Sequence, residues 1–247
     1  MNARLWGLMT SLLALPVAAC SAGLSAPSPT GPPSPAVSPS TSASSLPTPV
    51  PDDEQVVVSA AGVGDYDLQA IPVALLHNLA DHHAATQVIA HFTVRGPGGT
   101  YALDAAPVSL TAGQVLAVAA LCTSACQSAT AAAASVSVGG WEASAAVAVS
   151  SEPATFVCGT PCSGTAGYEG EASGSLTGQV VPGTLVNLFA SCASGTGAIV
   201  GGGVTQIVWA GTQGSTGSAT PPAESVAVPV LVTALPTSCE LYGAVAV

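Results

Sequence analysis

The densest group of reactive side chains in the sequence is the segment HNLADHH, which a further histidine follows. The segment holds His77, Asp81, His82 and His83, and His91 lies in the next apolar stretch. Imidazole and carboxylate groups are ligands that zinc, copper and nickel use in proteins. A metal site formed by His77, His82, His83 and His91 is therefore one hypothesis for this region.

The alternation of the flanking strands favours a simpler interpretation. His77 falls on the same face as Val73 and Leu75, whereas His91 falls on the face opposite to Phe92. Because side chains alternate across a strand, a hairpin with this parity separates the histidines unless a bulge intervenes. We interpret the segment as a polar turn with solvated imidazoles, and we expect no metal and no cofactor.

Four carboxylates form two pairs with i,i+2 spacing, Asp65 with Asp67 and Glu169 with Glu171. In a strand each pair lies on one face, where two acids could serve a hydrolase. Few aromatic residues are present to stack on a sugar, so the pairs are interpreted as acidic edges that deter strand pairing. A hydrolase that uses these carboxylates stays open as the alternative.

Serine is abundant, but the sequence marks out no nucleophile. The G-x-S-x-G elbow is absent, and no spacing selects one serine as the partner of a histidine and an aspartate. The glycine run 201–203 precedes no helical pattern, so we expect a bulge or turn there and no phosphate-binding loop. We therefore predict no catalytic residue.

The charge balance excludes several classes of function. The sequence has no lysine, only Arg4 and Arg95 as cations, 13 acidic residues and a formal net charge of -11, which the loss of Arg4 would take to -12. Binding to nucleic acid or to anionic lipid headgroups depends on cationic contacts, so neither is expected. Without lysine there is also no P-loop and no Schiff-base chemistry.

The first 19 residues are typical of an export signal. One cation, Arg4, precedes an apolar stretch that is too short to span a bilayer comfortably. The motif LPVAAC then resembles a bacterial lipobox, in which the cysteine is acylated and becomes the new N-terminus. We predict a lipoprotein signal peptide over 1–19 and a lipid anchor on Cys20; an ordinary signal peptide is the alternative.

The segment 20–53 consists almost wholly of Ser, Pro, Thr, Ala and Gly after Cys20. Such a composition cannot bury enough apolar surface to offset the entropy of ordering. Its prolines favour extended conformations, so the segment is predicted to be a disordered, semi-rigid spacer between a membrane and a folded part.

Six cysteines remain beyond Cys20, an even number that predicts three disulfides in an exported chain. An internal repeat favours Cys192–Cys239, and by the same correspondence Cys122–Cys158 and Cys126–Cys162. The alternative is two local bridges, Cys122–Cys126 and Cys158–Cys162. A zinc site built from the two CxxxC pairs is disfavoured, because such sites normally use CxxC.

Short apolar stretches separated by turn signals predict strands throughout the rest of the chain. The predicted strands are 55–59, 71–77, 86–94, 108–110, 115–121, 135–138, 144–149, 167–176, 183–190, 204–209, 226–233 and 239–245. The apolar stretch 112–138 is interrupted by polar residues, so we do not interpret it as a membrane span. The alanine run 129–134 has helix propensity but is too short to outweigh its flanks.

The two halves of the folded part resemble each other. AGQVLAVAALC and PGTLVNLFASC place Gly113 and Gly183, and also Cys122 and Cys192, 70 residues apart. Many short strands with turns about every 8–12 residues favour antiparallel sandwiches. We therefore predict an all-β fold of two tandem antiparallel Ig-like β-sandwich domains, 54–157 and 158–247, after the signal peptide and the linker.

The first predicted domain also resembles bacterial extracytoplasmic sandwich modules of the FxLYD and CARDB-like type. The features that carry the resemblance are Val73–Leu75, Asn78, Val88–Val94 with Phe92, Gly98-Gly99, and Val108 to Ala112-Gly113. The segment FTVRG lacks the Leu-Tyr-Asp that names the first family. The resemblance implies an Ig-like sandwich with a surface or interaction role.

Together these observations predict a protein on the outer, extracytoplasmic face of the cell membrane. Its membrane contact would be the lipid on Cys20, and its partner an unidentified envelope protein or polymer that it binds without catalysis. The lysine-free composition, rich in Ala, Gly and Pro, resembles that of proteins from high-GC actinobacteria. Metal capture through His77–His91 and hydrolysis by the carboxylates are the alternatives.

Overall fold

The computed structural model describes residues 54–67, 69–123, 126, 128–143, 149–159, 167–210 and 223–247. The predicted signal peptide, Cys20 and the predicted linker lie outside these residues. By its contacts, Thr48–Val247 forms one compact unit. No helix occurs among the described residues, and none there is long and apolar enough to cross a membrane.

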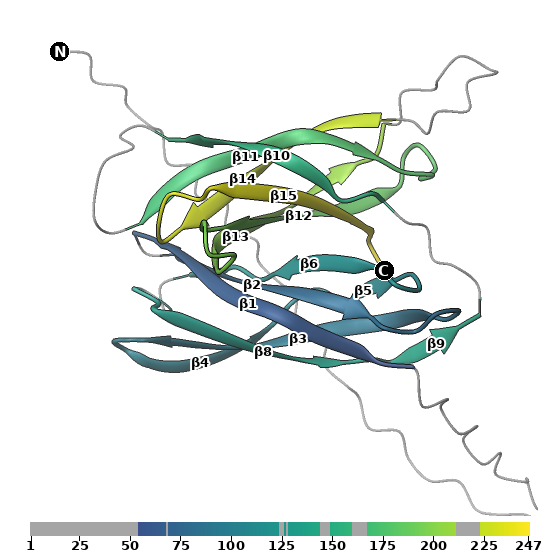
Figure 1. Cartoon of the computed structure of the whole chain (residues 1–247), viewed down its shortest axis with the longest axis horizontal. Coiled ribbons are helices and arrows are strands. Elements are labelled where there is room, and N and C mark those ends of the chain that lie inside the picture. Colours follow the sequence, from purple (N-terminus) through teal and green to yellow (C-terminus); the bar gives the residue numbers. More distant parts are fainter. Residues whose placement is uncertain are drawn as a thin grey trace, which may run out of the picture. The chain divides into compact units, whose positions relative to one another are not determined.

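Two antiparallel sheets form a sandwich in the first half (Figure 1). One has the order β1-β2-β6 with β7 beside β2, and the other has the order β4-β3-β5 with β8 and β9 also beside β3. The strands are β1 Val56–Tyr66, β2 Gln69–Asn78, β3 Ala84–Gly96, β4 Gly99–Asp104, β5 Val108–Leu110, β6 Val115–Ala119, β7 Cys122–Thr123, β8 Ala131–Ser137 and β9 Gly140–Glu142.

The six strands of the second half close on one another in the order β10-β11-β14-β13-β12-β15. Every strand of this closed sheet is paired with a neighbour on both sides. The sheet therefore has no exposed edge strand that could pair with another chain. The strands are β10 Glu152–Cys158, β11 Tyr168–Thr177, β12 Leu185–Ala193, β13 Ile199–Val208, β14 Ala223–Val232 and β15 Ser238–Val245. We call this closed sheet the barrel.

The predicted fold class is confirmed: the described part is all-β, antiparallel and sandwich-like. Residues 131–134 of the alanine run lie in the strand β8, and β6, β7 and β8 fall within the apolar stretch 112–138. The boundary predicted at 157/158 falls within β10, which pairs with β11 and β15 of the barrel. The division into two domains stays a prediction.

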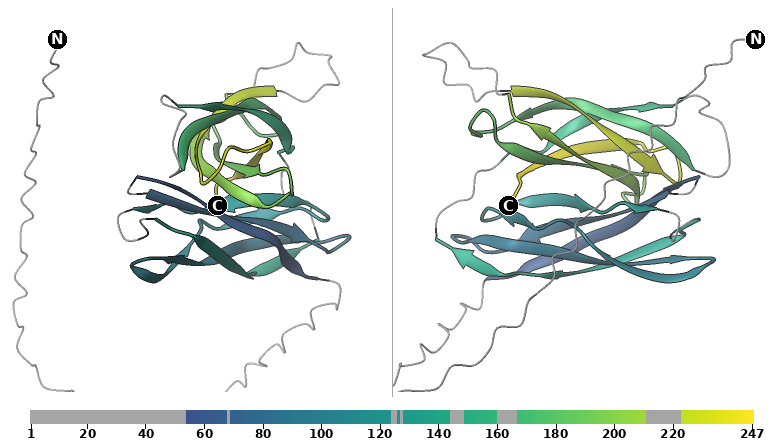
Figure 2. Two further views of the ribbon diagram at one scale, coloured as in Figure 1. Left: turned by 60° about the vertical axis from the view of Figure 1, so that its left-hand side comes forward. Right: turned by 180° about the vertical axis from the view of Figure 1, so that it is seen from behind.

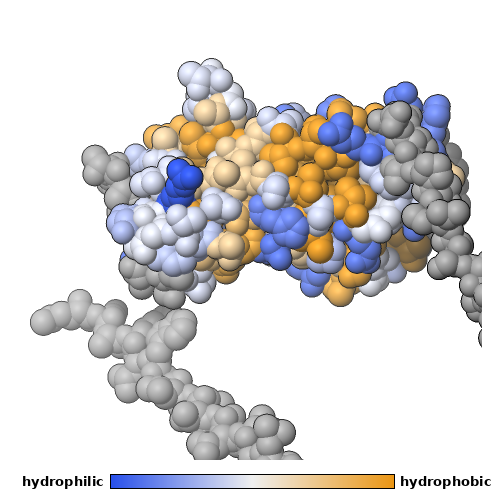
Figure 3. All heavy atoms as spheres, turned by 90° about the horizontal axis from the view of Figure 1, so that it is seen from below, coloured by the Kyte–Doolittle hydropathy of each residue, from blue (hydrophilic) through white to orange (hydrophobic). Residues whose placement is uncertain are grey.

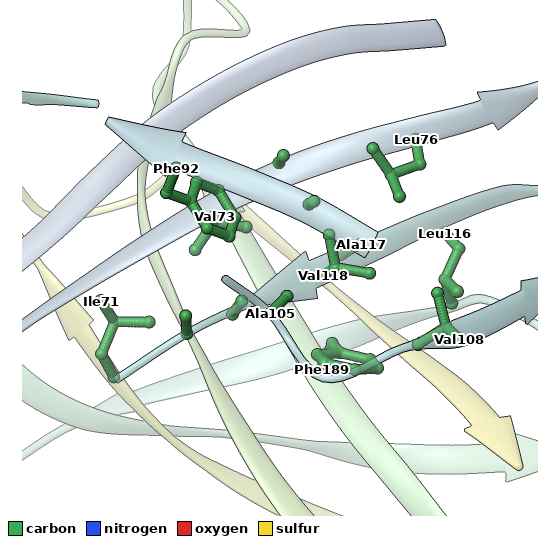
Figure 4. Close-up of a cluster of buried hydrophobic side chains, with 14 of the residues drawn as sticks. Ile71, Val73, Leu76, Phe92, Ala105, Val108, Leu116, Ala117, Val118 and Phe189 are labelled. Carbon is green, nitrogen blue, oxygen red and sulfur yellow. The ribbon is translucent and has the colours of Figure 1, made fainter. Parts of the chain in front are cut away.

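The barrel lies on the sandwich and contributes side chains to its hydrophobic core, in addition to a second core inside the barrel (Figures 1 and 2). Phe189, Leu231 and Tyr242 of the barrel belong to the same buried cluster as Val73 and Phe92 of the sandwich. Figure 4 shows Phe189 near Val108 of β5, within this buried cluster. The strand β2 is consequently buried on both faces, and its sequence AIPVALL is a continuous apolar run and not an alternating one.

Glycines make this close packing possible. A Cβ on Gly64 would lie 1.7 Å from the carbonyl oxygen of Leu231, and one on Gly62 would lie 2.4 Å from that of Ile199. The segment GVGD has glycines that are typical of a turn, yet it is part of β1, because glycine within a strand here marks a close approach of another backbone. A bulge or a turn was expected at the glycine run 201–203. The run begins at a β-bulge between β12 and β13.

One predicted disulfide is confirmed and two are corrected. Cys192 and Cys239 face each other on β12 and β15 and are bridged, with 4.1 Å between their Cα atoms. The favoured pairings Cys122–Cys158 and Cys126–Cys162 are wrong, because Cys122 is bridged to Cys126. The reason is topological: Cys122 lies on β7 beside β2, whereas Cys158 ends β10 in the barrel.

The disulfide pairing inferred from the repeat between the two halves was therefore wrong for Cys122 and Cys126. Cys158 is also disulfide-bonded, while Cys162 lies outside the described residues. Both repeats do begin with the same tight turn, with Gly113 and Gly183 at positive φ before β6 and β12. They diverge after that turn, since β12 continues as one long strand through Cys192.

We predict that Gly202→Ala destabilises the fold by about 1–3 kcal/mol, the usual cost of overpacking. The new Cβ would lie 2.1 Å from the carbonyl oxygen of Ala190 and 2.9 Å from Cγ2 of Val73. Gly195→Ala is the matched control, because its nearest neighbour would be 3.6 Å away. Urea unfolding measures both, and equal midpoints for the two variants would contradict this account.

Trp209 supplies a second test, inside the barrel. Its side chain is fully buried, and its indole Nε1 has no hydrogen-bond partner among the described residues. A buried donor without a partner costs about 1–3 kcal/mol. We predict that Trp209→Phe, which removes the donor, costs under about 1.5 kcal/mol, whereas Trp209→Ala costs about 3–5 kcal/mol in urea unfolding. Equal losses would show that the N–H has a partner.

Candidate functional site

Three side chains from three strands form a hydrogen-bonded series on the outer face of the sandwich. His91 Nδ1 lies 2.7 Å from Oδ1 of Asp104, and His91 Nε2 lies 2.8 Å from Oγ of Ser137. His91 is on the central strand β3, with Asp104 on β4 and Ser137 on β8 at either side. We call these three residues the Ser137 series.

The chain positions this series through strand register. The turn at Pro97 and Gly98 pairs Gly96 with Gly99, and this register carries His91 opposite Asp104. Pairing of β3 with β8 places Ser135 opposite His91 and Ser137 opposite Ile89, so the bond to Ser137 is diagonal. Neighbouring strands thus supply all three groups within reach of one another.

The carboxylate fixes the imidazole. An ionised Asp104 can only accept, so His91 Nδ1 must donate to it. In the neutral imidazole the lone pair then lies on Nε2, where it accepts the hydroxyl proton of Ser137. This is the order of groups that activates a serine hydroxyl as a nucleophile.

The series differs from an enclosed active site in its exposure. The His91 side chain is 41% exposed, that of Asp104 is 63% exposed, and Ser137 is an exposed residue. Water therefore reaches all three groups, and the strength of their hydrogen bonds is moderated by solvent. The arrangement can polarise a hydroxyl, but it does not exclude water from a bound molecule.

The surrounding surface is built of small side chains. Viewed from the side where β3, β4 and β8 lie, the molecule carries a broad hydrophobic area broken by hydrophilic side chains (Figure 3). Thr93, Ala102 and Ala133 are exposed on this face, next to the Ser137 series in the strand register. We call it the β3/β4/β8 face.

The predicted parity of the histidines holds for His91, which lies on the face opposite to the buried Phe92. His83 binds elsewhere: its Nδ1 lies 3.0 Å from Oε1 of Glu54, whose side chain is only 6% exposed. His77 is half-buried on β2 and His82 is exposed in the loop. Within the described residues, no three metal-ligating side chains come close enough to hold a metal ion.

A buried asparagine holds the histidine loop in place. Asn78 Nδ2 donates to the carbonyl oxygens of His83, Leu110 and Thr111, at 3.0, 3.3 and 2.9 Å. Its Oδ1 accepts from the N–H of Ala80 at 3.1 Å. These bonds tie the loop to the end of β5, which gives Asn78 a structural role.

The predicted acidic pairs differ in their surroundings. Glu169 and Glu171 are exposed on one side of β11, as their spacing predicts. Asp65 Oδ1 instead accepts the N–H of Ala129 at 3.1 Å, and Asp67 has a positive φ of 56° just beyond β1. Asp65 therefore ties the end of β1 to the segment before β8.

A groove of about 460 Å³ lies between β1 and β8, away from the Ser137 series. Small side chains line it, including Ala61, Ala129 and Ala131. Its hydroxyl groups are already engaged, since Thr130 Oγ1 donates to the carbonyl of Arg95 and Thr233 Oγ1 to that of Val200. None of the described side chains that line the groove is titratable, so they supply no acid, base or nucleophile there.

No catalytic residue was predicted from the sequence, so neither Asp104 nor Ser137 was identified there. A signal for Asp104 was present, because the two-residue turn in RGPGG sets the register that places it opposite His91. Ser137 had no such signal, since 46 residues separate it from His91 in the chain.

Comparisons with protein-family models, with curated proteins and with solved structures found no match to this chain.

Asp65 yields a prediction that depends on pH. Burial raises the pKa of this carboxyl above its usual value, although backbone N–H groups of Ala129 and Ser128 oppose the shift. A raised pKa in the folded state means that ionisation of Asp65 lowers stability as pH rises through that pKa. We expect Asp65→Asn, which keeps the acceptor for Ala129, to be at least as stable as the wild type at pH 7.

Urea unfolding at pH 7 and at pH 3 measures this effect. The advantage of Asp65→Asn should shrink at pH 3, where the carboxyl is protonated in both the folded and the unfolded chain. Asp67→Asn, two residues further along the chain, is the control for a general change in net charge. A variant that is less stable than the wild type only at pH 7 would overturn the assignment.

Proposed function

We propose that this chain is a protein anchored by a lipid to the outer, extracytoplasmic face of the cell membrane, with a non-catalytic binding or structural role in the cell envelope. The observation that carries the proposal is the motif LPVAAC, with Cys20 as the acylated residue. The proposal assigns no reaction to the protein, and its partner is an envelope protein or polymer.

The order of the segments supports this location. A spacer of about 30 residues, rich in proline and extended at up to about 3 Å per residue, would hold the folded part several nanometres from the lipid. Disulfides at Cys122–Cys126 and Cys192–Cys239 fit an oxidising, extracytoplasmic compartment. Since lysine is absent, attraction to anionic headgroups is weak and the lipid itself must supply the attachment.

The β3/β4/β8 face supports a binding role. It is formed by edge strands β4 and β8 on either side of β3, and exposed hydrophobic surface of this kind marks interaction sites on proteins. Small side chains such as Thr93, Ala102 and Ala133 leave it flat, so a polymer or a sheet could lie along it.

We predict that mass spectrometry of the mature protein, produced from the full chain in a lipoprotein-processing bacterium, finds an acylated Cys20 at the N-terminus. The motif LPVAAC resembles a lipobox, in which the thiol of the cysteine is acylated and this cysteine becomes the new N-terminus. Cys20→Ser should abolish the lipid mass and shift the protein out of the membrane fraction. A mature N-terminus at another residue, without acyl groups, would contradict the proposal.

Photocrosslinking in intact cells tests the binding role. A photoreactive residue at Ala133 should give a discrete adduct of higher mass, because this position lies within the β3/β4/β8 face. The same residue at Thr196, exposed in the turn between β12 and β13, is the control. No adduct at Ala133, or identical adducts at both positions, would contradict binding through this face.

A further inference from the structure

We propose that Ser137 is a nucleophile that accepts an acyl group from small, uncharged, activated esters, with His91 as its general base and Asp104 as the positioning residue. The inference goes beyond the proposed binding role and does not depend on the lipid anchor or on a partner. It rests on the two hydrogen bonds of 2.7 and 2.8 Å that join the three side chains.

The geometry assigns each group its part. Asp104 accepts from His91 Nδ1, which leaves the lone pair of the neutral imidazole on Nε2. Nε2 lies 2.8 Å from Ser137 Oγ, within the range in which a base takes a proton from a nucleophile. His91 is also held firmly, because Ala90 and Phe92 on either side of it are buried in the core.

The reaction is a single acyl transfer. Ser137 Oγ attacks the carbonyl carbon of the ester while its proton passes to His91 Nε2. The bond to the alcohol or phenol oxygen then breaks, and that leaving group takes the proton from His91 or leaves as the anion. The products are acyl-Ser137 and the free alcohol or phenol, and no oxidant, reductant or metal is required.

The open surface determines the class of substrate. Because the side chains of His91 and Asp104 are 41% and 63% exposed, the described residues around them form no enclosed pocket that could select a long or branched acyl chain. The net charge of -11 disfavours anionic acyl donors near the site. Small neutral esters with a good leaving group therefore fit best.

The same openness makes the transfer slow. Loss of one preorganised donor to the developing oxyanion costs about 10²–10³ in rate, and a hydrated surface provides none that is fixed and dry. An activated leaving group is needed for this reason. Hydrolysis of acyl-Ser137 needs the same stabilisation, so the acyl group accumulates on the serine and multiple turnover is weak.

The experiment exposes the full chain to 4-nitrophenyl acetate and measures acetylation by peptide mass spectrometry. Ser135 is the internal control, because it lies on the same face of the same strand and is also exposed. General-base catalysis contributes about 10²–10⁴ in rate, so we expect Ser137 to be acetylated about 10²-fold faster than Ser135. Equal rates at the two serines would overturn the proposal.

Variants separate chemistry from structure. His91→Gln should reduce the rate at Ser137 to that at Ser135, and Asp104→Asn should reduce it in part while Asp104→Glu restores it. Ser135→Ala should leave the rate at Ser137 unchanged. Circular dichroism and urea unfolding identify any variant that is misfolded, and a folded His91→Gln with undiminished acetylation of Ser137 would overturn the role of the base.

Discussion

The close contact between β13 and the strands β1 and β2 is the constraint on which the rest of the structure depends. A Cβ on Gly201 would lie 3.0 Å from the Cα of Gly64 and 2.1 Å from the carbonyl oxygen of Leu231. Only glycine allows backbones to approach so closely. Because they do, Phe189 and Tyr242 of the barrel reach the core of the sandwich. The core of the sandwich is thereby enlarged by side chains of the barrel, while the barrel also keeps a second core of its own.

The same contact explains which parts of the fold could be predicted. The strand 108–110 and the strands β11 to β15 follow from local patterns of apolar residues and turns, and they lie close to where these patterns indicate, whereas β10 was not predicted. β1 could not be bounded in this way, because glycine in GVGD signals a turn locally and a close approach only in the folded protein. Closure of the barrel likewise depends on pairings such as β10 with β15, which join residues far apart in the chain.

In the candidate site too, some positions follow from the local sequence and others depend on strands that are distant in the chain. The outward direction of His91 follows from the alternation of one strand, and Asp104 opposite it follows from a two-residue turn. The position of Ser137 depends on β8 pairing with β3 from 46 residues away, which no local pattern encodes. The disulfides show the reverse error, since distant repeat symmetry was favoured over the local bridge that Cys122 and Cys126 form.

The Ser137 series combines a rigid base with an open surface, and the two properties have different origins. Exposed hydrogen bonds contribute little to stability in water, so the series cannot hold its own geometry. The geometry comes from β3, whose inward side chains Val88, Phe92 and Val94 are fully packed and fix the outward direction of His91. The edge strands β4 and β8 supply Asp104 and Ser137, but they do not shield the Ser137 series from solvent. A sheet of this kind orients the groups for a proton transfer but does not exclude water from them. This favours reaction with activated acyl groups over efficient turnover.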